Sequence, residues 1–254
     1  MSGFRAYCDF SELCEGGEIP VGGSVELNAA ESRHLCGSLR ARAGDIVDVF
    51  DAKGNAYRCE LAEASSKSAA LRVIGRLYPK SPDVEVYLAQ CLPKGSAFDE
   101  IIRQSVELGA SGIYPLMSCR SVVRIGRADA EKKSAKWFEK YVEAIKQSSN
   151  LSKFEMPLVS DLSDFLSNSG GFGVKLVASL RENALPIYKV LTSAGVDFAK
   201  SACVLIGPEG DLSDAEYDAA ERAGFIPVKL GDNVMKCDTA AACALSVLKA
   251  FWQK

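Results

Sequence analysis

The sequence predicts an α/β protein in which a small β domain precedes a larger domain of alternating strands and helices. Residues 1–76 contain several short segments in the strand period, separated by turns. From residue 84 onward, apolar strand-like runs alternate with amphipathic helical runs, as in a doubly wound parallel sheet. Pro79-Lys80-Ser81-Pro82 lies between the two patterns, and its prolines disfavour both helix and central strand. We therefore expect domains at 1–78 and 79–254.

Bulk properties exclude several classes of protein. The net charge of -3 gives no overall basic field, so any contact with nucleic acid must come from local clusters. Nine cysteines without a C-x-x-C pair predict reduced thiols in a cytoplasmic protein. No apolar run has transmembrane length, so we expect no membrane partner. The single histidine, His34, excludes a His-rich metal site and a Ser-His-Asp triad in the second half, and we expect no metal.

The first domain is expected to be a small β-barrel or sandwich. Its predicted strands share alternating apolar residues and are bounded by turn residues; they are Val25–Leu27, Asp45–Phe50, Tyr57–Leu61 and Ala69–Ile74. The segment Glu31–Arg42 is predicted to form a short helix.

The second domain begins with a strand, a helix and a second strand. Val84–Cys91 is the first buried strand, and the apolar spacing from Phe98 to Leu108 predicts an amphipathic helix. Gly112–Met117 is the next strand, and this order predicts a parallel pair with a right-handed crossover. A long helix over Ala130–Gln147 follows.

The remaining elements repeat the strand-then-helix order. Val174–Ala178 is predicted as a strand and Leu185–Ala194 as a short helix. Ala202–Ile206 is another strand, and Ser213 with Glu216 forms a capping box at the start of the next helix.

That helix should end at Gly224, which can adopt left-handed geometry. The strand Ile226–Leu230 follows, and the last helix is expected to begin near Asp238 and to end near Trp252.

Two glycine loops follow two of these strands. Gly207-Pro208-Glu209-Gly210 ends one strand and Gly231-Asp232-Asn233 ends the next. Ligands of open parallel sheets bind beyond the carboxyl ends of the strands, and glycines allow the backbone to approach them closely. We expect both loops to line one crevice, flanked by Ser179-Leu180.

These loops resemble the two signature loops of the RsmE-type family of SPOUT methyltransferases. The matching segments are L-I-G-P-E-G-D-L-S-D-A-E (205–216) and V-K-L-G-D-N-V-M-K-C-D-T-A (228–240). The resemblance extends over nearly the whole chain, through R-H-L (33–35), G-D-x-V-x-V-F-D (44–51), the 92–110 segment and R-S-V-V-R (120–124). The chain departs from the family pattern at four places. It has Asp211-Leu212 where the family has Gly-Phe, Lys236 where the family has Arg, Asp238 where it has Glu, and Gln104 where many members have Lys.

The resemblance implies a fold and an activity. The fold is a SPOUT-type α/β domain with a C-terminal trefoil knot, preceded by a PUA-like β-barrel domain. The activity is S-adenosylmethionine-dependent methylation of a uridine at N3 in small-subunit (16S) ribosomal RNA, in the assembled 30S subunit, by a homodimer. The implied cofactor-binding residues are Ser179, Leu180, Gly207, Pro208, Glu209, Gly210, Leu230, Gly231, Val234, Met235, Lys236 and Thr239.

The chemistry requires that the uracil imide loses its proton during attack. The second domain has no histidine, so the candidate catalytic residues are Glu209, Arg120, Arg124 and Lys94, with Asp238 as a further candidate proton acceptor. Glu209 could equally hold its loop by accepting backbone hydrogen bonds. Candidate RNA-binding residues in the first domain are Arg33, His34, Arg40, Arg42 and Arg58. Two alternatives stay open: another SPOUT RNA methyltransferase, acting on tRNA or a ribose 2′-hydroxyl, and a catalytically silent RNA-binding or ribosome-assembly protein.

Overall fold

The protein forms two compact units in a computed structural model that describes residues 3–12, 18–193 and 195–253. Unit 1 comprises the chain up to Ser81 together with Ile145–Lys153. Unit 2 comprises Pro82–Ala144 and the chain from Phe154 onward. The expected α/β class, with a small β domain first, is confirmed.

Unit 1 is built on a five-stranded sheet in which β1 pairs with β3 in parallel and the other pairs are antiparallel. In spatial order the strands are β1 (Phe4–Tyr7), β3 (Ile46–Phe50), β4 (Ala56–Glu63), β5 (Ala70–Leu77) and β2 (Ser24–Glu26). The alternation predicted for β3 places Val47 and Val49 in the core, with the 3₁₀ helix η1 (Phe10–Glu12) contributing Phe10.

The helix expected over Glu31–Arg42 has different bounds. It begins with α1 (Ala29–Ser32), because the side chain of Asn28 accepts the backbone N–H groups of Ala30 and Glu31. It continues as the π-helical η2 (Arg33–Ser38) and ends before Leu39, which is 44% exposed. The nearly buried Glu31 carboxylate binds the ammonium of Lys146 at 2.7 Å, which ties the end of helix α3 into this unit.

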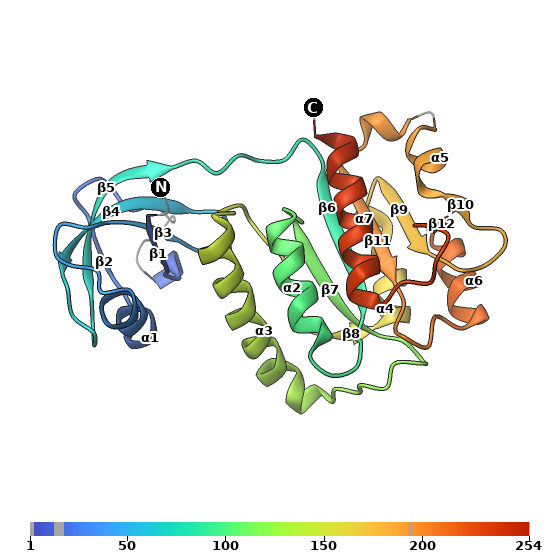
Figure 1. The fold of residues 1–254 in the computed structure, drawn as a ribbon, viewed down its shortest axis with the longest axis horizontal. Coiled ribbons are helices and arrows are strands. Elements are labelled where there is room, and N and C mark those ends of the chain that lie inside the picture. Colours follow the sequence, from blue (N-terminus) through green and yellow to red (C-terminus); the bar gives the residue numbers. More distant parts are fainter. Residues whose placement is uncertain (1–2, 13–17, 194, 254) are drawn as a thin grey trace. The chain divides into compact units, whose positions relative to one another are not determined.

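Unit 2 contains a seven-stranded parallel sheet (Figure 1). In spatial order its strands are β10 (Leu185–Pro186), β12 (Ile226–Lys229), β9 (Val174–Ala178), β11 (Ser201–Ile206), β6 (Glu85–Cys91), β7 (Gly112–Met117) and β8 (Ser160–Asp161). The central strands β6 and β11 are buried along almost their whole length and are mostly apolar, because helices cover both faces of the sheet.

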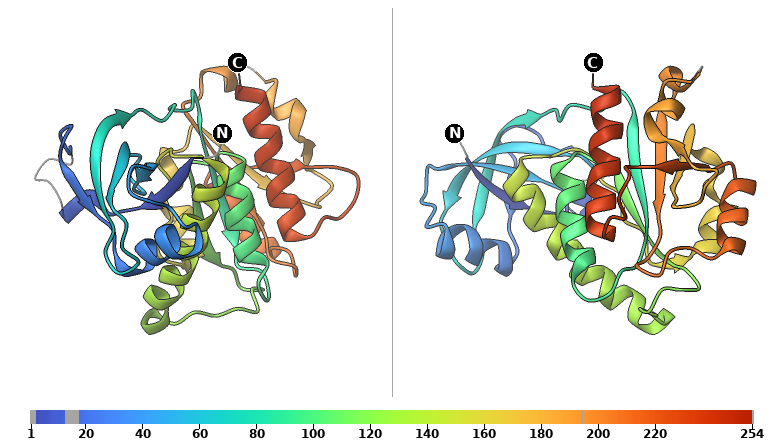
Figure 2. Two further views of the ribbon diagram at one scale, coloured as in Figure 1. Left: turned by 60° about the vertical axis from the view of Figure 1, so that its left-hand side comes forward. Right: turned by 45° about the vertical axis from the view of Figure 1, so that its right-hand side comes forward.

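Helices α2 (Ala97–Glu107) and α7 (Cys237–Trp252) pack side by side on one face of this sheet (Figure 2). Helices α4 (Leu162–Ser167) and α6 (Asp214–Arg222) cover the other face, where they share a core cluster with alternate residues of β6. The remaining helical elements are α3 (Arg127–Ser148), α5 (Ile187–Leu191), η3 (Ser169–Gly171) and η4 (Val196–Phe198).

Two further expectations for helices differ from the structure: the N-cap of the last helix and the extent of the helix after β9. The last helix begins at Cys237 with Lys236 as its N-cap, so that Asp238 lies in the first turn. The segment expected as a helix over Leu185–Ala194 is the short strand β10 followed by α5; Ala194 itself lies outside the described residues. The knot implied by the resemblance stays a prediction.

The strand order brings separate loops to one edge. β9 lies between β11 and β12, and β6 lies on the other side of β11. Because all these strands are parallel, the segments that follow them emerge together at the carboxyl edge of the sheet.

Candidate ligand-binding site

A cavity of about 320 Å³ lies at this edge, which places it within the range of roughly 300–1,000 Å³ typical of small-molecule sites. Its walls are the segments that follow β9, β11 and β12, together with the first turn of α7. The lining residues are Ala178, Ser179, Leu180, Ile206, Gly207, Pro208, Glu209, Asp211, Lys229, Leu230, Gly231, Asn233, Val234, Met235, Lys236, Cys237 and Ala240. The cavity therefore lies at the edge of the sheet where we expected the crevice.

The wall formed by residues 207–212 is held by Asp211. The backbone of Asp211 is left-handed, with φ of 60°. Its Oδ1 accepts the backbone N–H of Leu212 at 2.8 Å and the hydroxyl of Tyr217 at 2.6 Å. Aspartate tolerates this conformation better than most residues because its side chain can accept local hydrogen bonds. The buried side chain of Leu212 then anchors the end of the loop in the core.

Two neighbouring loops brace the same wall. Glu209 Oε1 accepts the backbone N–H of Lys94 at 2.8 Å, from the segment that follows β6. Arg120, in the segment that follows β7, donates through Nη1 to the carbonyls of Gly210 at 3.1 Å and Leu212 at 3.3 Å. These contacts are possible because β11, β6 and β7 are adjacent strands.

Helix α6 is fixed at the end of this wall. The capping box predicted from Ser213 and Glu216 is confirmed. Glu216 also accepts the backbone N–H of Cys119 at 2.7 Å. Burial raises the pKa of Glu216, but hydrogen bonds from Ser213 and Cys119 outweigh burial and hold that pKa below its ordinary value.

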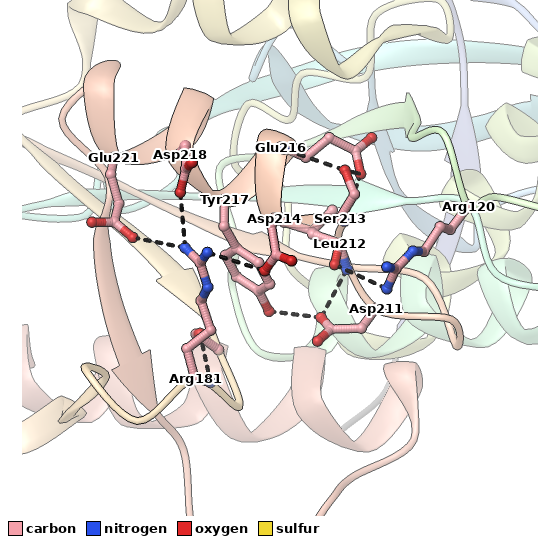
Figure 3. Close-up of polar contacts among 11 residues, drawn as sticks. Arg120, Arg181, Asp211, Leu212, Ser213, Asp214, Glu216, Tyr217, Asp218 and Glu221 are labelled. Atoms are coloured by element: carbon pink, nitrogen blue, oxygen red, sulfur yellow. Dashed lines mark hydrogen bonds and ion pairs between the residues drawn. The ribbon is translucent and has the colours of Figure 1, made fainter.

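Arg181 joins the segment that follows β9 to helix α6 (Figure 3). Its guanidinium forms ion pairs at 3.1 to 3.4 Å with three acidic residues of that helix, Asp214, Asp218 and Glu221. The same guanidinium lies over the ring of Tyr217, 5.1 Å from the centroid. Burial and the hydrogen bond to Asp211 both raise the pKa of Tyr217, so its hydroxyl remains a donor at neutral pH.

The opposite wall, residues 231–235, has far fewer contacts. Among the described residues, this segment makes no hydrogen bond. Val234 is 77% exposed. A Cβ at Gly231 would lie only 3.1 Å from Cε of Met235, so that side chain would have to shift to admit it. One wall of the cavity is therefore tightly held and the other is not.

The cofactor-binding residues expected from the resemblance line the cavity, with two exceptions. Gly210 contacts Arg120 instead: its carbonyl accepts a hydrogen bond from Nη1 of Arg120 at 3.1 Å. Thr239 is an exposed residue in the first turn of α7 and is not in the cavity wall. Whether the lining residues bind a cofactor stays a prediction.

Several residues of the site were not predicted. Cys237 and Ala240 are three residues apart, so they share one face at the start of α7. Because the predicted N-cap was Asp238, Cys237 fell outside the predicted helix and this face was not identified. Burial raises the pKa of the Cys237 thiol to about 11, with Glu209 contributing. Nothing in the sequence pattern indicated the contacts made by Arg181 and Tyr217.

Three of the candidate catalytic residues make loop contacts through their side chains, and Lys94 makes one through its backbone. Glu209 and Arg120 brace the cavity wall as described, and Arg124 donates to the carbonyl of Cys119 at 2.9 Å. Lys94 contributes its backbone N–H to Glu209, and its side chain is exposed. Asp238 lies in the first turn of α7.

The candidate RNA-binding residues of unit 1 differ in their exposure and in whether they form an ion pair. The guanidinium of Arg58 binds Asp48 through two hydrogen bonds of 2.9 and 3.2 Å. Arg33, Arg40 and Arg42 are exposed, and their guanidiniums have no ion-pair partner in the part of the chain that the structure describes. His34 is half-buried in η2.

The cavity is suited to a small organic ligand that carries both apolar and charged groups. Ile206, Leu230 and Met235 supply apolar surface, and Gly207 and Gly231 expose backbone groups without a Cβ. The wall also carries carboxylates and ammonium groups, so charged ligand atoms can be paired.

Comparison with known proteins gives a consistent result. The RNA methyltransferase domain family matches residues 79–249, and the RNA methyltransferase PUA domain family matches residues 27–74. Ribosomal RNA small subunit methyltransferase E of Bacillus subtilis is 28% identical over 91% of each chain. The protein of the same name from Synechocystis is 30% identical over 89% of this chain and 73% of its own length.

Solved structures agree. Ribosomal RNA small subunit methyltransferase E from Neisseria gonorrhoeae, crystallised with S-adenosylmethionine, superposes with a TM-score of 0.86 at 25% identity and covers 98% of both chains. The family match over more than half of the chain, together with 30% identity to the Synechocystis protein over 73% of its length, shows that this protein belongs to the ribosomal RNA small subunit methyltransferase E family.

Proposed function

We propose that the protein transfers a methyl group from S-adenosylmethionine to N3 of a uridine in small-subunit (16S) ribosomal RNA, with the assembled 30S subunit as its substrate. The cavity at the carboxyl ends of β9, β11 and β12 carries this proposal, because the loops that line it are the segments that resemble the family signature. The relatives from Bacillus subtilis and Synechocystis are named for the same class of RNA.

The residues present fit this cofactor. The glycine loops expose backbone groups that can pair with a purine and with ribose hydroxyls, and the apolar residues offer surface for the ring. The amino-acid end of the cofactor is zwitterionic, and the wall provides both lysines and carboxylates. When bound, S-adenosylmethionine supplies a methyl group on a cationic sulfur.

The chain's own residues must hold the acceptor base in line and receive its proton. We propose Glu209 as the proton acceptor, because it is the candidate carboxylate in the cavity wall and is exposed. Its Oε1 is engaged by Lys94, and a carboxylate retains further acceptor capacity on its second oxygen. Arg120, Arg124 and Lys94 position the surrounding segments, and their charges stabilise an anionic ring.

Glu209→Gln separates this role from bracing alone, since the amide oxygen still accepts the Lys94 N–H. Methyl transfer should be lost while the affinity for S-adenosylmethionine changes less than about threefold, a difference of under ~0.7 kcal/mol. Full activity of the variant would show that Glu209 serves only to hold its loop.

Unit 1 is proposed to bind the RNA, with the methyltransferase role assigned to residues 79–254. Among the described residues, the guanidiniums of Arg33, Arg40 and Arg42 have no ion-pair partner, so they support this role better than the paired Arg58; His34 follows Arg33 in the sequence. The double variant Arg40→Ala, Arg42→Ala should bind the small subunit more weakly. The slope of the logarithm of its binding constant against the logarithm of the salt concentration should be smaller by about two. Arg58→Ala, the matched control, should change the slope less. Equal effects would contradict the assignment.

We further propose that the protein is a cytoplasmic homodimer. One side of α7 is buried within its own subunit, whereas Ala242, Cys243 and Val247 are only half-buried on the other side. Small apolar side chains on that side allow close approach of a second copy, and two-fold dimers are the commonest closed assembly. A monomer mass in light scattering at micromolar concentration would contradict the dimer.

No helix of the described residues is both long and apolar enough to cross a bilayer.

The direct test is methylation of small subunits that lack the modification. Incubation with the protein and S-adenosylmethionine should add one methyl group to a uracil base, located by mass mapping of the 16S RNA. Methylation of tRNA instead, or of a ribose, would point to a different RNA methyltransferase. Binding of S-adenosylmethionine without transfer to any RNA would indicate a silent RNA-binding protein.

A further inference from the structure

Asp211 places in the cavity wall a carboxylate that the proposed proton transfer does not use. Its left-handed backbone and two hydrogen bonds, at 2.6 and 2.8 Å, fix the side chain through a single oxygen, Oδ1. Within the described part of the chain, the second oxygen, Oδ2, has no hydrogen-bond partner. An ionised carboxylate can accept on both oxygens, so Oδ2 remains available to a ligand.

The donor that orients Asp211 is itself well held. The hydroxyl of Tyr217 lies 2.6 Å from Asp211 Oδ1 and 3.3 Å from the carbonyl of Ala178, so its proton is directed to the carboxylate. The ring of Tyr217 is buried and packs beneath the guanidinium of Arg181 (Figure 3). Such an arrangement keeps the charge of Asp211 in one place before any ligand arrives.

The other charged residues of the cavity are held differently. One oxygen of Glu209 is engaged by the backbone of Lys94. Lys229 and Lys236 also line the cavity and are exposed. Asp211 is therefore a negative charge that neighbouring side chains orient within the wall.

We propose that the Asp211 carboxylate binds a cationic group of the bound cofactor. This inference rests on the proposed function, since S-adenosylmethionine carries two such groups, the α-ammonium and the sulfonium. Because a fixed charge loses little conformational freedom on binding, it contributes more affinity than a mobile one.

Asp211→Asn removes the charge with little change in shape. Asparagine also tolerates the left-handed backbone, and its amide oxygen can still accept from Leu212 and Tyr217. The matched control is Asp232→Asn, which removes the same charge from an exposed residue in the opposite loop that does not line the cavity.

The experiment is calorimetric titration of the full chain with three ligands: S-adenosylmethionine, S-adenosylhomocysteine, which lacks the sulfonium, and 5′-methylthioadenosine, which lacks both cations. Asp211→Asn should weaken S-adenosylmethionine binding at least about tenfold, as expected for a hydrogen bond to a charged group. It should leave 5′-methylthioadenosine unchanged, and Asp232→Asn should leave all three unchanged. If Asp211→Asn loses as much affinity for S-adenosylhomocysteine as for S-adenosylmethionine, the group bound by Asp211 is the ammonium. If its affinity for S-adenosylhomocysteine is unchanged, that group is the sulfonium. Either result supports the proposal.

Tyr217→Phe tests the orienting bond, because it keeps the ring under Arg181 and removes only the hydroxyl. It should weaken S-adenosylmethionine binding less than Asp211→Asn does, again without affecting 5′-methylthioadenosine. Unchanged S-adenosylmethionine affinity in Asp211→Asn, or an equal loss for all three ligands, would overturn the role of Asp211 and leave the proposed function standing. Failure of the unmodified protein to bind S-adenosylmethionine would overturn both.

Discussion

Two loops form opposite walls of the same cavity, yet they are held very differently. Residues 207–212 are tied to three other segments through Lys94, Arg120 and Tyr217. Residues 231–235 make no hydrogen bond among the described residues. Segments with few contacts open at little cost in free energy. On this basis we expect residues 207–212 to be preformed and residues 231–235 to gain order when a ligand binds.

The largest expected difference between the walls is in stability. Leu212→Ala should lower the free energy of unfolding by about 2–5 kcal/mol, because Leu212 is only 2% exposed and anchors its loop in the core. Val234→Ala, in the opposite wall, should change it by less than about 0.5 kcal/mol, since that side chain is 77% exposed. Urea denaturation of the two variants measures this difference, and comparable losses would remove the contrast between the walls.

A smaller effect is expected on affinity. Arg120→Ala removes the donor to the carbonyls of Gly210 and Leu212, so the preformed wall should loosen. The dissociation constant for S-adenosylmethionine should rise about tenfold, which corresponds to about 1.4 kcal/mol. Arg124→Ala is the control, because within the described part of the chain Arg124 donates only to the carbonyl of Cys119. Calorimetry that gave both variants the same affinity would show that Arg120 does not hold the wall.

The smallest expected effect is a pH dependence at Glu216. Its pKa is lower in the folded protein than its ordinary value of about 4.5. It therefore stabilises the fold above the unfolded-state pKa, and this contribution is lost as the pH falls through the folded pKa. Between roughly pH 5 and pH 3, the unmodified protein should lose more stability than Glu216→Gln. Parallel pH curves for the two proteins in thermal unfolding would refute this account of the helix cap.

The sequence predicted the elements of the preformed wall better than the contacts that hold them. The capping box at Ser213 depends on residues three positions apart, so it was visible in the sequence. The hydrogen bond from Lys94 to Glu209 joins segments far apart in the chain and depends on β6 lying beside β11. Strand order across the sheet is not encoded in local periodicity, so this contact could not be predicted.

The N-cap of the last helix was misassigned for a local reason. Asp238 is a favourable N-cap residue, but the N-cap is Lys236 and the helix begins at Cys237. Lys236 occupies the N-cap position without a side-chain hydrogen bond, and the aspartate lies in the first turn, where its charge favours the helix dipole. In the observed helix, Cys237 and Ala240 both line the cavity.

Amide hydrogen exchange with and without S-adenosylmethionine tests the two-wall account most directly. Peptides covering residues 207–212 should be protected in the free protein and should change little when the cofactor is added. Peptides covering residues 231–235 should exchange rapidly in the free protein and gain protection with the cofactor. Equal protection of both segments in the free protein, or protection by the cofactor confined to other parts of the chain, would contradict the account.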